Sequence, residues 1–65
     1  MIDNIEFARW FRANTVRNAV YLQVRASEAD CWPSHADFLR HRARELLEFA
    51  ESIDSWIAMK SRGAV

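Results

Sequence analysis

The chain has 65 residues, with nine basic and nine acidic side chains and a formal net charge of zero. Its residues are 51% hydrophobic and include three Trp, four Phe and one Tyr, a composition that argues against disorder. The balanced charge gives no general drive toward DNA, RNA or anionic lipid. A domain this short buries only about 60% of the surface of its unfolded chain, so we expect it to need extra stabilisation such as association.

Cys31 is the only cysteine, which excludes a disulfide within the chain and suits a reducing compartment. A disulfide between two copies of the chain is the alternative. No run of 18 apolar residues is present, so we expect no membrane contact. The first residues, MIDNIEF, are acidic and lack the features of a secretory signal, which predicts a cytoplasmic protein.

The first predicted element is a helix over about residues 3–28. Asp3 and Glu6 have the spacing of a capping box, and Ile2 can close a hydrophobic staple over it with Phe7. Aromatic residues and one leucine share a side of the helical wheel, with alanines on the flank, and we expect this side to face the second helix. These residues are Phe7, Trp10, Phe11, Tyr21 and Leu22, flanked by Ala8, Ala19 and Ala26.

Polar residues interrupt the aromatic side of the first helix. Asn14, Thr15 and Asn18 fall in that sector, where a buried amide destabilises the fold unless it is hydrogen-bonded. They form either a polar layer that sets the register, like the buried Asn of coiled coils, or a recognition site.

A second apolar stripe lies roughly opposite the aromatic side. It consists of Val16, Val20 and Val24. These valines would be exposed in a single hairpin, and an exposed apolar patch usually marks an interface. We interpret the stripe as part of a dimer interface; a different partner protein and simple exposure are the alternatives.

Residues 29–34 are predicted to form a loop. Pro33 disfavours a helical conformation at Trp32, and Ser34 is a candidate N-cap for a second helix, with Asp37 three residues further on. A loop of this length suits antiparallel neighbours. Trp32 at the tip either closes the end of the core or presents an aromatic anchor to a partner.

The second predicted helix covers about residues 35–61, with Gly63 as the glycine that follows its end. Its apolar residues cover about half of the circumference, which is more than one packed neighbour requires. We therefore predict an all-α fold: one domain over residues 1–65, an antiparallel two-helix hairpin that dimerises into a four-helix arrangement. The predicted dimer interface combines the three valines with Phe49, Ile53 and Trp56.

The charges are separated along the chain. The charged residues from Phe7 to Ala26 are all arginines, and those from Glu45 to Asp54 are all acidic. In an antiparallel hairpin Arg9 and Arg12 would come near Glu51 and Asp54, and each exposed pair would contribute less than about 1 kcal/mol. A nucleic-acid-binding dimer would use the same helix-one arginines, which are Arg9, Arg12, Arg17 and Arg25.

The sequence contains no recognisable catalytic or metal-binding motif. Cys31, His35, Asp37 and His41 cluster, but the two histidines point about 120° apart on a helix and no second Cys completes a zinc set. Cys31 has no orienting base, and Gly63 is the only glycine, so a phosphate-binding loop is missing. We expect no metal, no cofactor, no small-molecule substrate and no enzymatic activity.

The segments FARWFRANTVRNAVYLQVRA and DFLRHRARELLEFA, with the length and two-helix layout, resemble the anti-quorum-sensing proteins of Pseudomonas transposable phages, which are dimeric helical hairpins. The resemblance implies a phage-encoded protein that binds a LuxR-type transcriptional activator of the host and blocks its DNA binding. No binding residues carry over from it.

We predict that Trp32, Arg40 and Arg44 contact the partner, because a dimer interface would leave the hairpin tip uncovered. Two other functions stay open at this point. One is a small nucleic-acid-binding dimer, and the other is a structural or chaperone subunit of a phage or bacterial assembly.

Overall fold

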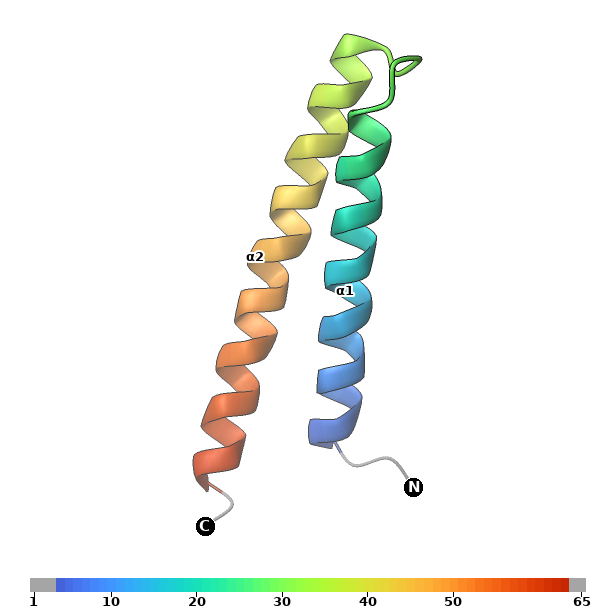
Figure 1. Ribbon diagram of the computed structural model, residues 1–65. Helices are drawn as coiled ribbons and strands as arrows, with labels where there is room; N and C mark the ends of the chain where they lie inside the picture. Colours follow the sequence, from blue (N-terminus) through green and yellow to red (C-terminus); the bar gives the residue numbers. More distant parts are fainter. Residues whose placement is uncertain (1–3, 64–65) are drawn as a thin grey trace.

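The computed structural model describes residues 4–63 and consists there of two helices. Helix α1 spans Asn4–Ala26 and helix α2 spans Pro33–Gly63, and they run antiparallel with a short loop at one end (Figure 1). The predicted all-α hairpin is therefore confirmed for the single chain. We call the loop end the tip, and the end where α1 begins and α2 ends the open end.

The ends of α2 differ from the prediction. The helix begins at Pro33, and the Ala36 amide donates to the Trp32 carbonyl oxygen at 2.8 Å. Proline suits the first helical position, because no intrahelical donor is needed there. Ser34 is thus the second residue of the helix, and its predicted role as N-cap is wrong. Gly63 lies inside the helix without a positive φ, so it is not the left-handed residue after the helix end.

Helix α1 ends two residues earlier than predicted, at Ala26. Backbone hydrogen bonds from the next two amides continue the turn, with N···O distances of 3.1 and 3.2 Å. The predicted capping box and staple depend on Asp3 and Ile2, which lie outside the described residues.

The contact between the two helices is made mainly of small side chains. The buried residues are Thr15, Ala19, Ala26, Ala36, Leu39, Ala43 and Ala50. Successive members on each helix are three, four or seven residues apart, as in a pair of coiled helices. No large side chain among residues 4–63 is fully buried. Because alanines leave little between the two backbones, the helices can pack closely in the part of the hairpin nearer the tip.

The aromatic side of α1 was predicted to face α2; this holds for Leu22 and Phe11, which contact residues of α2, and is wrong for the other three residues. Phe7, Trp10 and Tyr21 are 50%, 62% and 62% exposed. The contact is made by the alanine flank instead, which is rotated by about 100° around the helix, the angle between consecutive residues. Large aromatic side chains at the centre of the contact would hold the helices apart, whereas Ala19 and Ala26 allow close approach.

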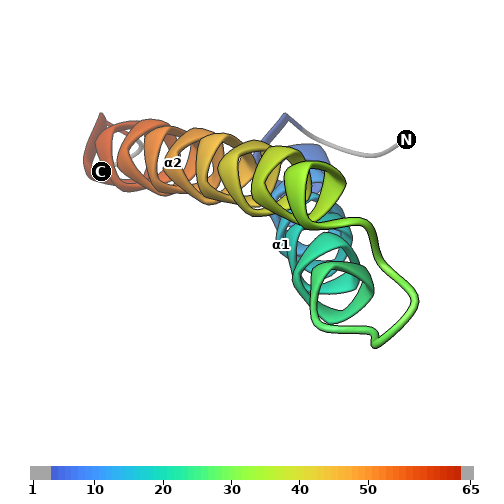
Figure 2. The same cartoon turned by 90° about the horizontal axis from the view of Figure 1, so that it is seen from above.

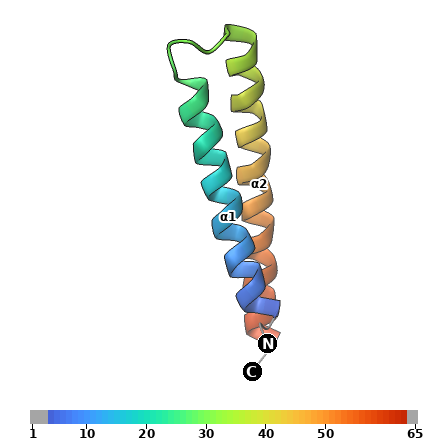
Figure 3. The same cartoon turned by 90° about the vertical axis from the view of Figure 1, so that its right-hand side faces the viewer.

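The hairpin is a single layer of two helices. Its Cα atoms extend over 51 × 21 × 11 Å. The radius of gyration is 15.1 Å, compared with about 11 Å for a compact domain of this length. The helices cross at an angle, as the comparison of Figures 1 and 3 shows, and Figure 2 gives the view from the tip. Both broad faces of the layer are uncovered, although a domain normally buries such faces against a second layer.

One ion pair joins α1 to α2 in the part of the chain that the structure describes. Arg12 Nε lies 2.9 Å from Asp54 Oδ1 near the open end. This confirms the predicted proximity of basic and acidic residues at that end for this pair. Both side chains are about half exposed, so the pair contributes less than about 1 kcal/mol to stability.

Candidate protein-binding faces

One broad face of the hairpin, which we call the aromatic face, carries most of the aromatic side chains. Ring contacts and the 100° rotation per residue place on it Phe7 and Phe11 of α1 and Phe38, Phe49 and Trp56 of α2, with Trp10 and Tyr21 at its outer edge on α1. The eighth aromatic residue, Trp32, lies at the tip. A single hairpin leaves most of these rings about half exposed to water.

The rings near the open end contact one another in a continuous array. Phe7 lies 5.9 Å from Trp10 and 6.0 Å from Phe11, measured between ring centroids. Phe11 meets Phe49 edge to face at 5.8 Å, which joins α1 to α2. An edge-to-face pair contributes about 0.5–1.5 kcal/mol beyond its buried area, so the array holds these rings in a defined arrangement.

The aromatic face is hollowed beside this array. The hollow has a volume of about 350 Å³. It is lined by Asn4, Phe7, Ala8, Phe11, Phe49, Ile53 and Trp56. Asn4 is its only polar residue, and the Lys60 ammonium lies 5.6 Å from the Trp56 ring just beyond it. Such a hollow favours an apolar side chain over a polar ligand.

Asn14 and Asn18 lie in the middle of the aromatic face, where both side chains are exposed. Their neighbour Thr15 is buried, and its hydroxyl donates to the Phe11 carbonyl oxygen at 2.8 Å. Thr15 therefore satisfies its own hydrogen bond within the helix. The two amides remain available for a partner.

The opposite face carries the valine stripe, and we call it the valine–arginine face. It consists of Val16, Val20 and Val24 of α1 with Arg40, Arg44 and Leu47 of α2. Val20 is nine residues after Phe11, so the two side chains point to opposite sides of α1. Val20 and Val24 are 49% and 57% exposed.

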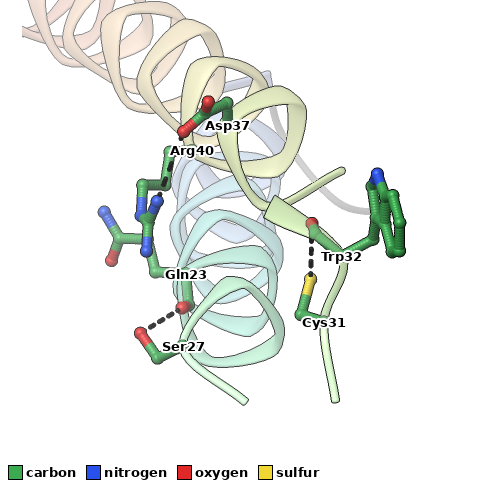
Figure 4. Close-up of polar contacts among 6 residues, drawn as sticks. All are labelled: Gln23, Ser27, Cys31, Trp32, Asp37 and Arg40. Atoms are coloured by element: carbon green, nitrogen blue, oxygen red, sulfur yellow. Dashed lines mark hydrogen bonds and ion pairs between the residues drawn. The ribbon is translucent and has the colours of Figure 1, made fainter. Parts of the chain in front are cut away.

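A groove of about 370 Å³ lies on the valine–arginine face near the tip. It is lined by Gln23, Ser27, Arg40, Arg44 and Leu47. The Ser27 hydroxyl donates to the Gln23 carbonyl oxygen at 3.1 Å, and Arg40 Nη1 lies 3.5 Å from Asp37 Oδ1 (Figure 4). Arg44 has no ion-pair partner within residues 4–63. The groove therefore combines one apolar residue, Leu47, with polar side chains and two arginines.

The predicted dimer residues do not form one patch. Phe49, Ile53 and Trp56 line the hollow of the aromatic face, whereas Val16, Val20 and Val24 lie on the opposite face. A flat contact with one other chain can cover only one of these groups. Trp10, which contacts Phe7 at the hollow, was not among the predicted dimer residues. Its spacing to Phe7 and Phe11 placed it on the side of α1 that was expected to face α2.

The predicted partner-binding residues are also divided. Arg40 and Arg44 line the same groove. Trp32 is 73% exposed and lies on the other side of the tip, with its ring directed away from Arg40 (Figure 4). Gln23 and Ser27 could not be identified from the sequence, because they complete the groove only when the antiparallel packing brings them beside Arg40.

The arginines of α1 do not form a basic stripe. Arg12 pairs with Asp54, and Arg25 pairs with Glu28. The four arginines together are spread over about 220° of the helix circumference, so no single surface presents them all. This arrangement does not favour the tracking of a nucleic-acid backbone.

Cys31 contributes to packing at the tip. It contacts the cluster of Ala26, Ala36 and Leu39, and its Sγ lies 3.8 Å from the Trp32 carbonyl oxygen. Over residues 4–63, no group of three or more His, Cys, Asp or Glu side chains could hold a metal ion. In the same stretch, neither helix is long and apolar enough to cross a membrane.

Comparison of the chain with protein-family models, with curated proteins and with solved structures gave no match. Inference about function therefore depends on the two faces described above.

Proposed function

We propose that this protein acts by binding another protein through its helical surfaces, without catalysis, and that it thereby inhibits a transcriptional regulator. The supporting observation is the distribution of apolar side chains. Ten large hydrophobic residues are 37–73% exposed, while the interior of the hairpin holds mainly alanines. Contiguous exposed apolar surface of this kind marks sites where other proteins bind.

The valine–arginine face is the proposed contact with the regulator. Val20, Val24 and Leu47 supply apolar area, and Arg40 and Arg44 supply a charged rim, the composition expected of a site for an amphipathic helix. The guanidinium of Arg44 is free to pair with a carboxylate of the partner, and Arg40 can exchange its long contact with Asp37 for a shorter one.

The more specific form of the proposal follows the resemblance to phage anti-quorum-sensing proteins. In this form a homodimer binds a LuxR-type activator in the host cytoplasm at a fixed stoichiometry and keeps it from DNA. The length of the chain and its confirmed hairpin layout support this form.

The test is a titration of the purified protein into a LuxR-type activator bound to its operator. We expect the activator–DNA complex to disappear when the two proteins are close to equimolar. Replacing both Arg40→Ala and Arg44→Ala should weaken the inhibition at least about 10-fold, because charged groups at an apolar contact are worth about 1–3 kcal/mol.

The matched control replaces Arg17→Ala and Arg62→Ala, which are also exposed but lie outside the groove. This variant should inhibit like the original protein. Equal loss in both double variants would show that overall charge, and not the groove, is responsible. Binding of the protein to the operator alone, weakened by salt, would support the nucleic-acid alternative and contradict the proposal.

A further inference from the structure

We infer that a second copy of this chain covers the aromatic face, giving a two-fold symmetric dimer whose valine–arginine faces stay outside. The proposed function does not depend on which face forms the dimer, and this inference does not depend on the identity of any partner. Of the six residues predicted for the dimer interface, Phe49, Ile53 and Trp56 belong to this interface, and the three valines do not.

The hairpin exposes more surface than a compact protein of its mass. Its accessible surface is 5289 Å², whereas a compact monomer of 7.6 kDa exposes about 4,300 Å². The excess is about 1,000 Å², and a partner in a stable protein complex typically loses about 800 Å². Covering one broad face would therefore give the chain the surface of an ordinary folded protein.

The two faces also differ in composition, and the aromatic face is the one that resembles an interface centre. Interface centres are rich in Trp, Tyr and Phe and poor in charge, which describes the aromatic face. Most of its charged residues are already engaged: Arg42 pairs with Glu45 at 3.3 Å, Lys60 lies over the Trp56 ring, and Arg25 pairs with Glu28. Arg17 lies between Trp10 and Tyr21 at the outer edge of the face, where its guanidinium can stay in water. A dimer through the opposite face would instead remove Arg40 and Arg44 of both copies from water, at a large cost in free energy.

The shape of the aromatic face also suits a contact between two copies. A two-fold interface uses the same patch on both copies, so a projection and a recess must occur on one face. Trp10 is 62% exposed and contacts Phe7, which lines the hollow. The hollow is large enough for an indole ring, so the face offers both parts of a self-complementary contact.

The test begins with sedimentation equilibrium of the full chain from low to high micromolar concentration. The original protein should have twice the chain mass of 7.6 kDa. Trp10→Ala should raise the dimer dissociation constant at least about 30-fold, the effect of losing a central aromatic anchor. Val20→Ala, which truncates a half-exposed residue on the side of α1 opposite Phe11, should change it by no more than about 2-fold.

Circular dichroism of each variant separates loss of association from loss of folding. If Trp10→Ala loses its helices, the interface is tested in the original protein instead, by intermolecular NOEs between isotope-labelled and unlabelled copies. NOEs from the Trp10 indole to aromatic rings of the other copy support the inference. A helical monomer at high micromolar concentration would overturn it, and so would intermolecular NOEs from the Val16 and Val20 methyl groups.

Discussion

The contact between α1 and α2 and the aromatic face contain apolar side chains of very different size. Ala19 and Ala43 at the contact are completely buried, while Trp10 and Tyr21 on the aromatic face are 62% exposed. A single hairpin thus buries its smallest apolar groups and exposes its largest ones. The comparison indicates that the inner contact fixes the geometry of the layer, while most of the available hydrophobic free energy is reserved for a surface outside it.

The largest expected effect comes from enlarging the inner contact. Ala43→Leu would insert a branched side chain where none of the alanine surface is accessible, forcing the helices apart. Overpacking of this kind should destabilise the protein by about 3 kcal/mol, the upper part of the usual range. Thermal unfolding should then begin more than about 10 °C lower.

Ala13→Leu is the matched control, because it adds the same atoms to an exposed position of α1. Its melting temperature should stay within a few degrees of the original value. Similar melting temperatures for the two variants would show that the alanine contact tolerates extra volume, contrary to the comparison.

A medium effect is expected in the middle of the aromatic face. Replacing Asn14→Leu and Asn18→Leu removes two amides from the inferred interface, so the dimer dissociation constant should fall about 10-fold. A buried Asn in coiled coils sets the register at a cost in stability, and its loss allows other arrangements. We therefore expect tighter association together with broadened NMR signals of the aromatic rings.

The same dissociation constant is measured by dilution of a fluorescently labelled chain. Gln23→Leu, an exposed polar residue of the groove on the opposite face, serves as control and should leave it unchanged. Weaker association of the asparagine variant would mean that the amides recognise a polar group, which is the other interpretation of these residues.

The smallest effect is expected for the ion pair between the helices. A double-mutant cycle with Arg12→Ala and Asp54→Ala should give a coupling free energy below about 1 kcal/mol, because both side chains are about half exposed. The coupling should shrink further in molar salt. Urea unfolding of the four proteins measures it, and a coupling of several kcal/mol would mean that association buries the pair.

The sequence was sufficient to predict the hairpin and its polarity. Pro33 marks the break between two uninterrupted helical segments, and the short loop indicates antiparallel helices, which in turn predicts that Arg12 and Asp54 lie close together. The beginning of α2 was less certain from sequence, because proline at the first position and serine at the cap are both common. Proline took the first helical position here.

The orientation of α1 could not be predicted from hydrophobicity alone. Apolar residues occur around most of the helix, and ranking them by size favours the side of Phe7 and Trp10. The close contact selects small side chains instead, and this preference becomes visible only when the alanines of both helices are considered together, with Ala19, Ala43 and Ala50 all buried. The division of the dimer residues between two faces follows from that same orientation.

The alanine contact also affects how the protein responds to temperature. Each methyl group exposes little apolar surface on unfolding, so separating the helices changes the heat capacity only slightly. Exposing the aromatic face to water contributes much more to the heat-capacity change, because its side chains are large and apolar. In a chain whose partner is a second copy, the curvature of stability with temperature therefore comes mainly from assembly, and the folded fraction depends on the amount of protein present.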